Sequence, residues 1–121
     1  MSGILYIVAT PIGNLNDITI RAIEVLKQSD YILAESSART SKLLHEYDIK
    51  KKIVTFNKDN EKRKRSSILR DLSSGSVLAL VSDAGTPSIS DPGFELVESF
   101  NKDYRIIPIP GASSLTCALS I

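Results

Sequence analysis

The chain has 121 residues, of which 42% are hydrophobic and 24% charged, with a net charge of +1. These values fit one domain of ordinary soluble composition. A single cysteine, Cys117, excludes an internal disulfide framework, and with only one histidine, His45, the chain is poorly supplied for structural zinc. We predict that Cys117 is a small buried apolar residue. The N-terminus has neither the basic segment of a signal peptide nor an apolar run long enough to span a membrane, which favours a cytoplasmic protein.

Short apolar runs bounded by loop residues predict five strands, at residues 4–9, 31–34, 53–56, 77–81 and 105–109. Helical spacing of apolar residues predicts a helix after each strand. The first helix begins at a cap on Asn16 or Asp17 and ends near residue 28, and the second covers residues 38–47 after a cap on Ser37. The others cover residues 60–72, residues 92–100, and the segment from Ser113 or Ser114 onward. This alternation predicts an α/β fold with a mostly parallel five-stranded sheet and helices on both faces.

Right-handed crossovers place all the loops that follow strands at one edge of such a sheet, where ligands of parallel sheets bind. The richest of these loops, residues 82–91, follows a buried strand, and two X-Pro steps should stiffen it. No G-x-G-x-x-G or G-x-x-x-x-G-K-[ST] motif is present, which argues against a standard dinucleotide site and against triphosphate hydrolysis. The loop therefore predicts another kind of ligand site, although a solvated connection is the alternative.

Charge is distributed unevenly along the chain. Residues 50–70 hold nine basic and two acidic side chains, a net of +7, so the remainder carries −6. Four of the basic residues lie near the start of a predicted helix, where they oppose the helix dipole: Lys62, Arg63, Lys64 and Arg65. This segment suggests a surface that contacts the phosphates of a nucleic acid. A solvated helix face is the alternative.

Three long motifs occur in order: LYIVATPIGNLNDITIRA at residues 5–22, ALVSDAGTPSISDPG at residues 79–93 and PIPGASSLTCALS at residues 108–120. Together they resemble the tetrapyrrole methylase family. Members that methylate corrin precursors usually carry G-D-P where this chain has Gly85, Thr86 and Pro87, so the resemblance is to the branch that methylates RNA.

The resemblance implies S-adenosylmethionine as methyl donor, bound in a cleft between two α/β domains, and 2′-O-methylation of a cytidine in the 16S rRNA of the small ribosomal subunit. It also implies a homodimer. The residues that it implies for the cofactor side of the cleft are Pro11, Ile12, Asp83, Gly85, Thr86, Ile89, Ser113 and Ser114. Turn formation or helix capping is the alternative role of each.

Transfer to a ribose hydroxyl needs alignment and a base. Glu35 and Asp83 are the candidate bases, and each could instead be a structural hydrogen-bond acceptor. The family usually shows A-E-D-T-R where this chain has A-E-S-S-A at residues 34–38. Either a contact made by the missing Asp and Arg is lost here, or Arg39 has taken it over.

The chain ends inside an apolar, helix-like run, and we therefore expect residues 1–121 to be the N-terminal domain of a two-domain methyltransferase. Without the second wall of the cleft, this domain should bind cofactor poorly and should not turn over. A tetrapyrrole methyltransferase and a non-catalytic RNA-binding module remain as alternative functions.

Overall fold

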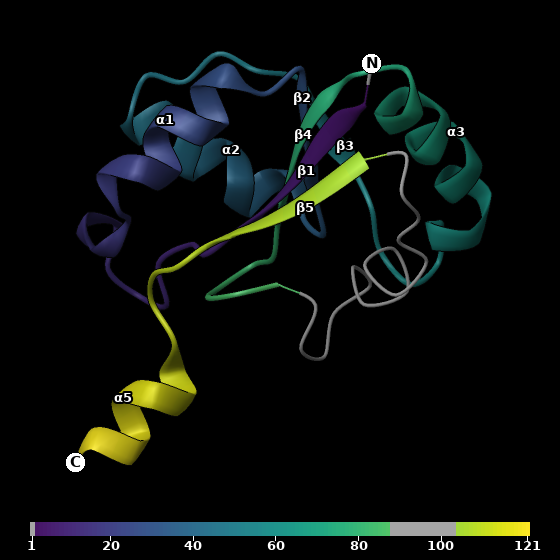
Figure 1. Ribbon diagram of the computed structural model, residues 1–121. Coiled ribbons are helices and arrows are strands. Elements are labelled where there is room, and N and C mark those ends of the chain that lie inside the picture. The colour runs from purple at the N-terminus through teal and green to yellow at the C-terminus, as the bar shows by residue number, and fades with distance from the viewer. Residues whose placement is uncertain (1, 88–103) are drawn as a thin grey trace.

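The structure is a computed structural model that describes residues 2–87 and 104–121. Figure 1 shows the sheet at the centre with helices on either side. The strands are β1 (Gly3–Val8), β2 (Tyr31–Ala34), β3 (Ile53–Thr55), β4 (Val77–Val81) and β5 (Tyr104–Ile109). The helices are the 3-10 turn η1 (Leu15–Asp17), α1 (Ile20–Gln28), α2 (Ser37–Glu46), α3 (Glu61–Ser73) and α5 (Ser114–Ser120). The predicted helix at residues 92–100 lies outside the described residues.

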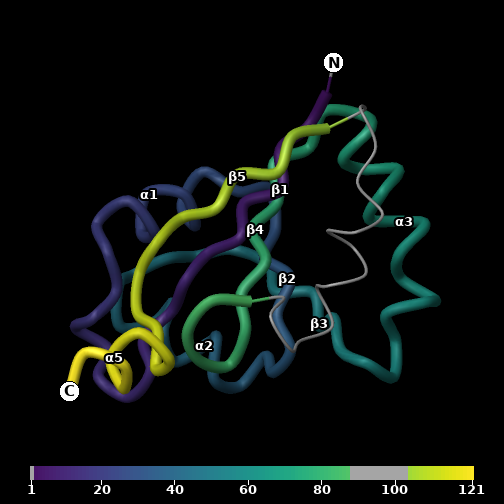
Figure 2. The backbone as a smooth tube through the Cα atoms, turned by 60° about the horizontal axis from the view of Figure 1, so that its bottom comes forward, coloured from purple at the N-terminus to yellow at the C-terminus, as the bar shows by residue number. Residues whose placement is uncertain are grey.

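The five strands form one parallel sheet in the order β3-β2-β4-β1-β5, an order that can be followed in Figure 2. The predicted fold class and all five predicted strands are confirmed, with boundaries that differ by at most one residue. β1 lies between β4 and β5, and its residue Ile4 pairs with Val77 of β4 and with Arg105 of β5. A strand in this position is covered on both faces, which explains its continuous apolar sequence.

Helices cover both faces of the sheet, and each face has its own hydrophobic core. Alternate residues of β1 supply the two cores, because successive side chains of a strand point to opposite faces. Leu5 and Ile7 pack in the core that includes Ile68 and Leu72 of α3, whereas Val8 packs in the core under α1 and α2. Figure 1 shows α1 and α2 on one side of the sheet and α3 on the other.

The predicted caps of the first two helices are wrong. Thr19, not Asn16 or Asp17, caps α1, and its Oγ1 accepts a hydrogen bond from the Ala22 amide at 3.0 Å. Asn14 caps the short turn η1 that intervenes, by accepting from the Asn16 amide. At α2 the capping position is Ser36, which makes no side-chain capping bond, and Ser37 is the first residue of the helix.

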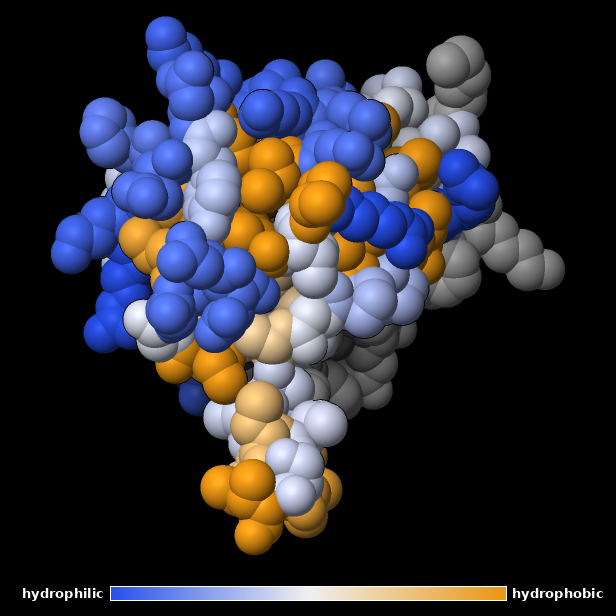
Figure 3. All heavy atoms as spheres, turned by 90° about the vertical axis from the view of Figure 1, so that its left-hand side faces the viewer, coloured by the Kyte–Doolittle hydropathy of each residue, from blue (hydrophilic) through white to orange (hydrophobic). Residues whose placement is uncertain are grey.

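The last helix begins where predicted, with Ser113 as its cap. None of its residues is buried, so the predicted burial of Cys117 is wrong: the thiol is exposed. Leu115 and Leu119 are 64% and 78% exposed, and Figure 3 shows the apolar tip that they help to form. The physical reason is position, because α5 extends beyond the end of the sheet and away from both cores (Figure 1).

Candidate functional site

The strand order creates a crevice at the carboxyl ends of β1 and β4. In the strand order, β2 lies beyond β4 from β1, whereas β5 lies beyond β1 from β4. The connections β1 to β2 and β4 to β5 therefore run in opposite directions across the sheet. Two adjacent strands whose connections leave in opposite directions form a topological switch point, where open parallel sheets bind their ligands. The loops that follow β1 and β4 are residues 9–14 and 82–87, which contain parts of two of the three motifs.

A pair of backbone hydrogen bonds joins these two loops. The Thr10 amide donates to the Gly85 carbonyl at 2.9 Å, and the Gly85 amide donates to the Thr10 carbonyl at 2.9 Å. The Thr10 hydroxyl adds weaker contacts to the carbonyls of Ser82 and Gly85, at 3.4 and 3.5 Å. The bridge closes the base of the crevice and fixes how the two loops face each other.

Gly85 is the point at which three loops meet. Its φ of +77° lies in the left-handed region, which side chains rarely adopt. A Cβ atom built on Gly85 would lie 3.3 Å from the Cγ2 atom of Ile12 and 3.6 Å from the carbonyl oxygen of Ala112. The loops that follow β1, β4 and β5 therefore approach one another closely at Gly85.

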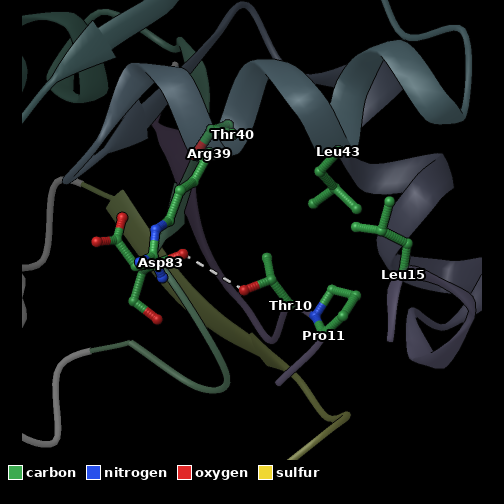
Figure 4. Close-up of a pocket in the computed structure, with 8 residues that line it drawn as sticks. Thr10, Pro11, Leu15, Arg39, Thr40, Leu43 and Asp83 are labelled. Atoms are coloured by element: carbon green, nitrogen blue, oxygen red, sulfur yellow. Dashed lines mark hydrogen bonds between the residues drawn. The ribbon is translucent and has the colours of Figure 1, made fainter. Parts of the chain in front are cut away.

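A pocket of about 280 Å³ opens beside this junction. It is lined by Pro11, Ile12, Gly13, Leu15, Arg39, Lys42, Asp83 and Ala84. A second, smaller pocket of about 50 Å³ shares four of these residues and adds Thr10, Thr40, Leu43 and Ser82. Figure 4 shows the side chains around the smaller pocket, with α2 above it and the loops after β1 and β4 below.

Asp83 is the acidic residue of both pockets. Its Oδ1 atom is buried and has no hydrogen-bond partner among the described residues. A carboxylate oxygen that is removed from water without a donor is costly, which marks it as an acceptor for a ligand. Arg39 extends from α2 toward Asp83 (Figure 4), so a cation and a carboxylate face the same space.

Not every predicted site residue lines these pockets. Pro11, Ile12 and Asp83 do, whereas Glu35, Gly85, Thr86, Ser113 and Ser114 do not. Glu35 is half-buried and follows β2 at the same edge of the sheet. The Ser113 hydroxyl accepts a hydrogen bond from the Thr116 amide at 3.2 Å, so it caps α5. Ile89 lies outside the described residues.

Sequence reasoning missed Lys42 and the part that Arg39 takes in the pocket. The two side chains are three residues apart on α2, so they share one face of the helix. Both line the larger pocket. Their spacing was the available signal, because α2 follows a loop at the predicted ligand edge and a cationic pair on its first turns faces that edge.

The four basic residues at the start of α3 fall into two groups. Lys62 and Arg63 are exposed. Lys64 is half-buried, and its ammonium group donates to the Thr55 carbonyl at 2.6 Å and to the Thr55 hydroxyl at 3.1 Å. Arg65 is half-buried as well. Of these four, the first two are therefore at the surface, and Lys64 joins α3 to the end of β3.

The model of the family Tetrapyrrole (Corrin/Porphyrin) Methylases matches residues 4–121. The chain belongs to this family. Across the residues that the structure describes, 2–87 and 104–121, no helix is long and apolar enough to cross a membrane.

Several curated relatives are about half identical to the chain and carry the name "Ribosomal RNA small subunit methyltransferase I". The protein of Halalkalibacterium halodurans is 51% identical over 97% of the chain, that of Leptospira biflexa 47% over 98%, and that of Bacillus subtilis 48% over 97%. The chain covers 41%, 50% and 40% of the lengths of these relatives, respectively, and so spans about half of each at most.

Solved structures share the fold at lower identity. The chain is similar to a diphthine synthase, with a TM-score of 0.74 and 20% identity over 98% of this chain and 48% of the other. It is also similar to the uroporphyrin-III-C-methyltransferase of Thermus thermophilus, with a TM-score of 0.72 and 21% identity over 98% of this chain and 50% of the other. These likenesses establish the architecture only.

Proposed function

We propose that the chain is the N-terminal domain of an S-adenosylmethionine-dependent methyltransferase that modifies a ribose 2′-hydroxyl of a 16S rRNA cytidine. The observation that carries this proposal is the pocket at the switch point between β1 and β4, which brings Pro11, Ile12 and Asp83 together. Relatives about half identical to the chain are named for methylation of small-subunit ribosomal RNA, whereas similarity to the uroporphyrin enzyme is at the level of the fold.

The residues present at the crevice fit the proposed cofactor. Gly85 packs closely against Ile12 and Ala112 and so holds the loops around the pocket together. Oxygen acceptors suit the cationic and amino groups of the cofactor, and the Asp83 carboxylate in the pocket carries two, so that one oxygen can face the cofactor while the other is left for the substrate. When bound, S-adenosylmethionine supplies a methyl group that the ribose oxygen takes from sulfur, which leaves S-adenosylhomocysteine.

Asp83 is the stronger of the two candidate bases. A base must reach the hydroxyl that it deprotonates, and Asp83 lines the pocket in which that hydroxyl would lie. Glu35 lies at the same edge of the sheet but lines neither pocket, and it already has an interaction with another residue. In this assignment the Asp83 carboxylate accepts the proton as the new oxygen–carbon bond forms, and Glu35 is structural.

The proposal includes a second domain as the other wall of the cleft, a homodimer and a cytoplasmic location. Exposed apolar side chains on α5 support the second domain, because Leu115 and Leu119 extend away from the sheet and lie outside both described cores. The coverage of about half of each relative supports it as well. The isolated 121-residue chain is then expected to bind cofactor weakly and to lack turnover.

Calorimetric titration with S-adenosylhomocysteine tests the proposal, using this chain and a chimaera in which the chain is joined to the remaining part of the Halalkalibacterium halodurans relative. We expect tight binding by the chimaera alone, together with transfer of labelled methyl groups to purified small ribosomal subunits. Absence of binding from both proteins would refute the assignment. Methyl transfer to a tetrapyrrole and not to ribosomal subunits would establish the alternative enzyme, and RNA binding that ignores the cofactor would establish the non-catalytic module.

A further inference from the structure

The larger pocket combines two kinds of polar group, one basic and one acidic. Arg39 and Lys42 of α2 form its basic side, and Asp83 at the end of β4 forms its acidic side. The Oδ1 atom of Asp83 is buried without a donor among the described residues. The pocket thus offers donors for an anion and one acceptor for a neutral hydroxyl.

A ribose within an RNA strand carries this pair of groups in the required proximity. Its 2′-hydroxyl and its 3′-phosphate are attached to neighbouring carbon atoms, so one nucleotide can donate to a carboxylate and place a phosphate against cations. Arg and Lys are the side chains that bind phosphate, Arg through its planar fork and Lys as a point charge. The volume of about 280 Å³ lies just below the usual range of ligand pockets and fits part of one nucleotide.

We infer that Arg39 and Lys42 bind the phosphate on the 3′ side of the target ribose and thereby present its 2′-hydroxyl to Asp83. This inference rests on the proposed function and adds the substrate contact that positions the acceptor. Pro11 and Ile12, assigned to the cofactor side, line the same pocket. The ribose hydroxyl that accepts the methyl group and the cofactor that donates it then meet across this pocket, as an in-line transfer requires.

Arg39 and Lys42 are positioning residues in this assignment, because they hold the phosphate while Asp83 contacts the reacting hydroxyl. Both are exposed at the pocket mouth, where a strand of RNA can reach them. Arg39 also compensates for the arginine that this chain lacks in the family's usual A-E-D-T-R segment. A cation missing at Ala38 is present one residue later, and it points toward Asp83 (Figure 4).

Equilibrium binding of a fluorescent single-stranded RNA by this chain tests the inference. The variant is Arg39→Ala with Lys42→Ala, and the matched control is Arg21→Ala with Lys27→Ala, which removes two exposed charges from another helix, α1. We expect the first variant to bind about tenfold more weakly and its logarithmic salt slope to fall by about 0.7 to 1, the value for one lost phosphate contact. A larger loss in the control than in the pocket variant would overturn the inference, as would an absence of RNA binding by the unaltered chain.

A second measurement separates the hydroxyl contact from the phosphate contact. The unaltered chain should bind RNA more tightly than a 2′-deoxy strand of the same sequence, and Asp83→Ala should reduce that preference without removing the salt dependence. An unchanged preference would refute the contact with Asp83.

A measurement of cofactor binding distinguishes a failure of this inference from a failure of the proposed function. The chimaera with Arg39→Ala and Lys42→Ala should bind S-adenosylhomocysteine as the unaltered chimaera does. Loss of cofactor binding with unchanged RNA binding would overturn the inference, because the two cations would then hold the cofactor carboxylate. Failure of the unaltered chimaera to bind cofactor would refute the proposed function, while the RNA measurements would still decide the phosphate site.

Discussion

Thr10 and Gly85 lie 75 residues apart and exchange both of their backbone hydrogen bonds, each at 2.9 Å. This bridge holds the loop after β1 against the loop after β4 at the point where the chain direction across the sheet reverses. Side chains on both loops then line one pocket. The geometry of the proposed site consequently depends on a contact between backbone groups, and its sensitivity to mutation is predictable.

Gly85→Ala should disturb the junction of the three loops. The left-handed φ of +77° is strained for alanine, and the new Cβ would press on Ile12 at 3.3 Å. We expect the free energy of unfolding to fall by about 1 to 2 kcal/mol, as measured by urea denaturation, with weaker cofactor binding by the chimaera. Gly13→Ala is the control for stability, because nothing lies within 4 Å of the position that its Cβ atom would take, and it should leave the free energy of unfolding nearly unchanged. Equal effects at the two glycines would contradict this account.

Thr19→Ala removes the hydrogen bond that caps α1. The variant should lose about 1 kcal/mol of stability, because the Ala22 amide would lack its partner within the helix end. Asn16→Ala should change little, since the Asn16 side chain is exposed and it is the Asn14 side chain that caps η1. Thermal unfolding of both variants shows which residue caps α1. Greater destabilisation by Asn16→Ala than by Thr19→Ala would favour Asn16, the cap that the sequence predicted.

Lys64→Met should destabilise the fold, whereas Lys62→Met should not. Lys64 donates to both oxygen atoms of Thr55 at the end of β3, and hydrogen bonds from charged groups each contribute on the order of 1.5 kcal/mol or more. Lys64 is half-buried, so screening by water should reduce the loss to about 1 kcal/mol. Chemical denaturation of the two variants measures the difference. RNA affinity supplies the second readout: if Lys64 contacts RNA instead of Thr55, its variant will lose affinity and keep its stability.

Alkaline pH should destabilise the protein through Tyr31. Burial raises the pKa of the Tyr31 hydroxyl well above its usual value of 10, and the hydrogen bond to Asp71 at 2.6 Å raises it further. A raised pKa in the folded state stabilises the fold below about pH 10, and this contribution is lost as the pH rises above that value. Burial raises the pKa of Tyr104 in the same direction. Unfolding free energy should therefore decrease with pH above about 10.

Tyr31→Phe tests the source of this dependence. The variant should be less stable at neutral pH, because Asp71 loses its donor, and its stability should fall less steeply between about pH 10 and 11.5. Asp71→Asn removes the neighbouring charge but keeps the Tyr31 hydroxyl. The dependence of its unfolding free energy on pH should therefore lie between that of Tyr31→Phe and that of the unaltered chain. A slope that Tyr31→Phe leaves unchanged would assign the effect to Tyr104 instead.

The sequence predicts the strands well because each is an apolar run long enough for one buried strand, as residues 77–81 show. The helix starts were less predictable. Thr19, Asn16 and Asp17 are all capping residue types within one turn, and only the intervening turn η1, set by Asn14, decides which of them begins the helix.

The motifs predict only part of the lining of the pocket. Pro11, Ile12 and Asp83 belong to long motifs and line it, whereas Gly85, Thr86, Ser113 and Ser114 belong to the same motifs and do not. Lys42 belongs to no motif, and its place in the pocket follows from the rotation of α2 about its axis, which the packing of Leu43 and Leu44 determines. Lys64 could have been separated from its neighbours, because it lies four residues before the buried Ile68 and so shares its face of α3.

The place of β1 inside the sheet has a consequence for the order of events during synthesis. Gly3–Val8 leaves the ribosome long before its two neighbours, Val77–Val81 and Tyr104–Ile109. This strand therefore has no native partner until Val77–Val81 has been translated, and its second edge lacks a partner until Tyr104–Ile109 has been translated. Pairing across such sequence distances is slow and leaves strands open to aggregation. Nascent chains shorter than about 110 residues should consequently depend on a chaperone that shields this segment, since β5 ends only at Ile109.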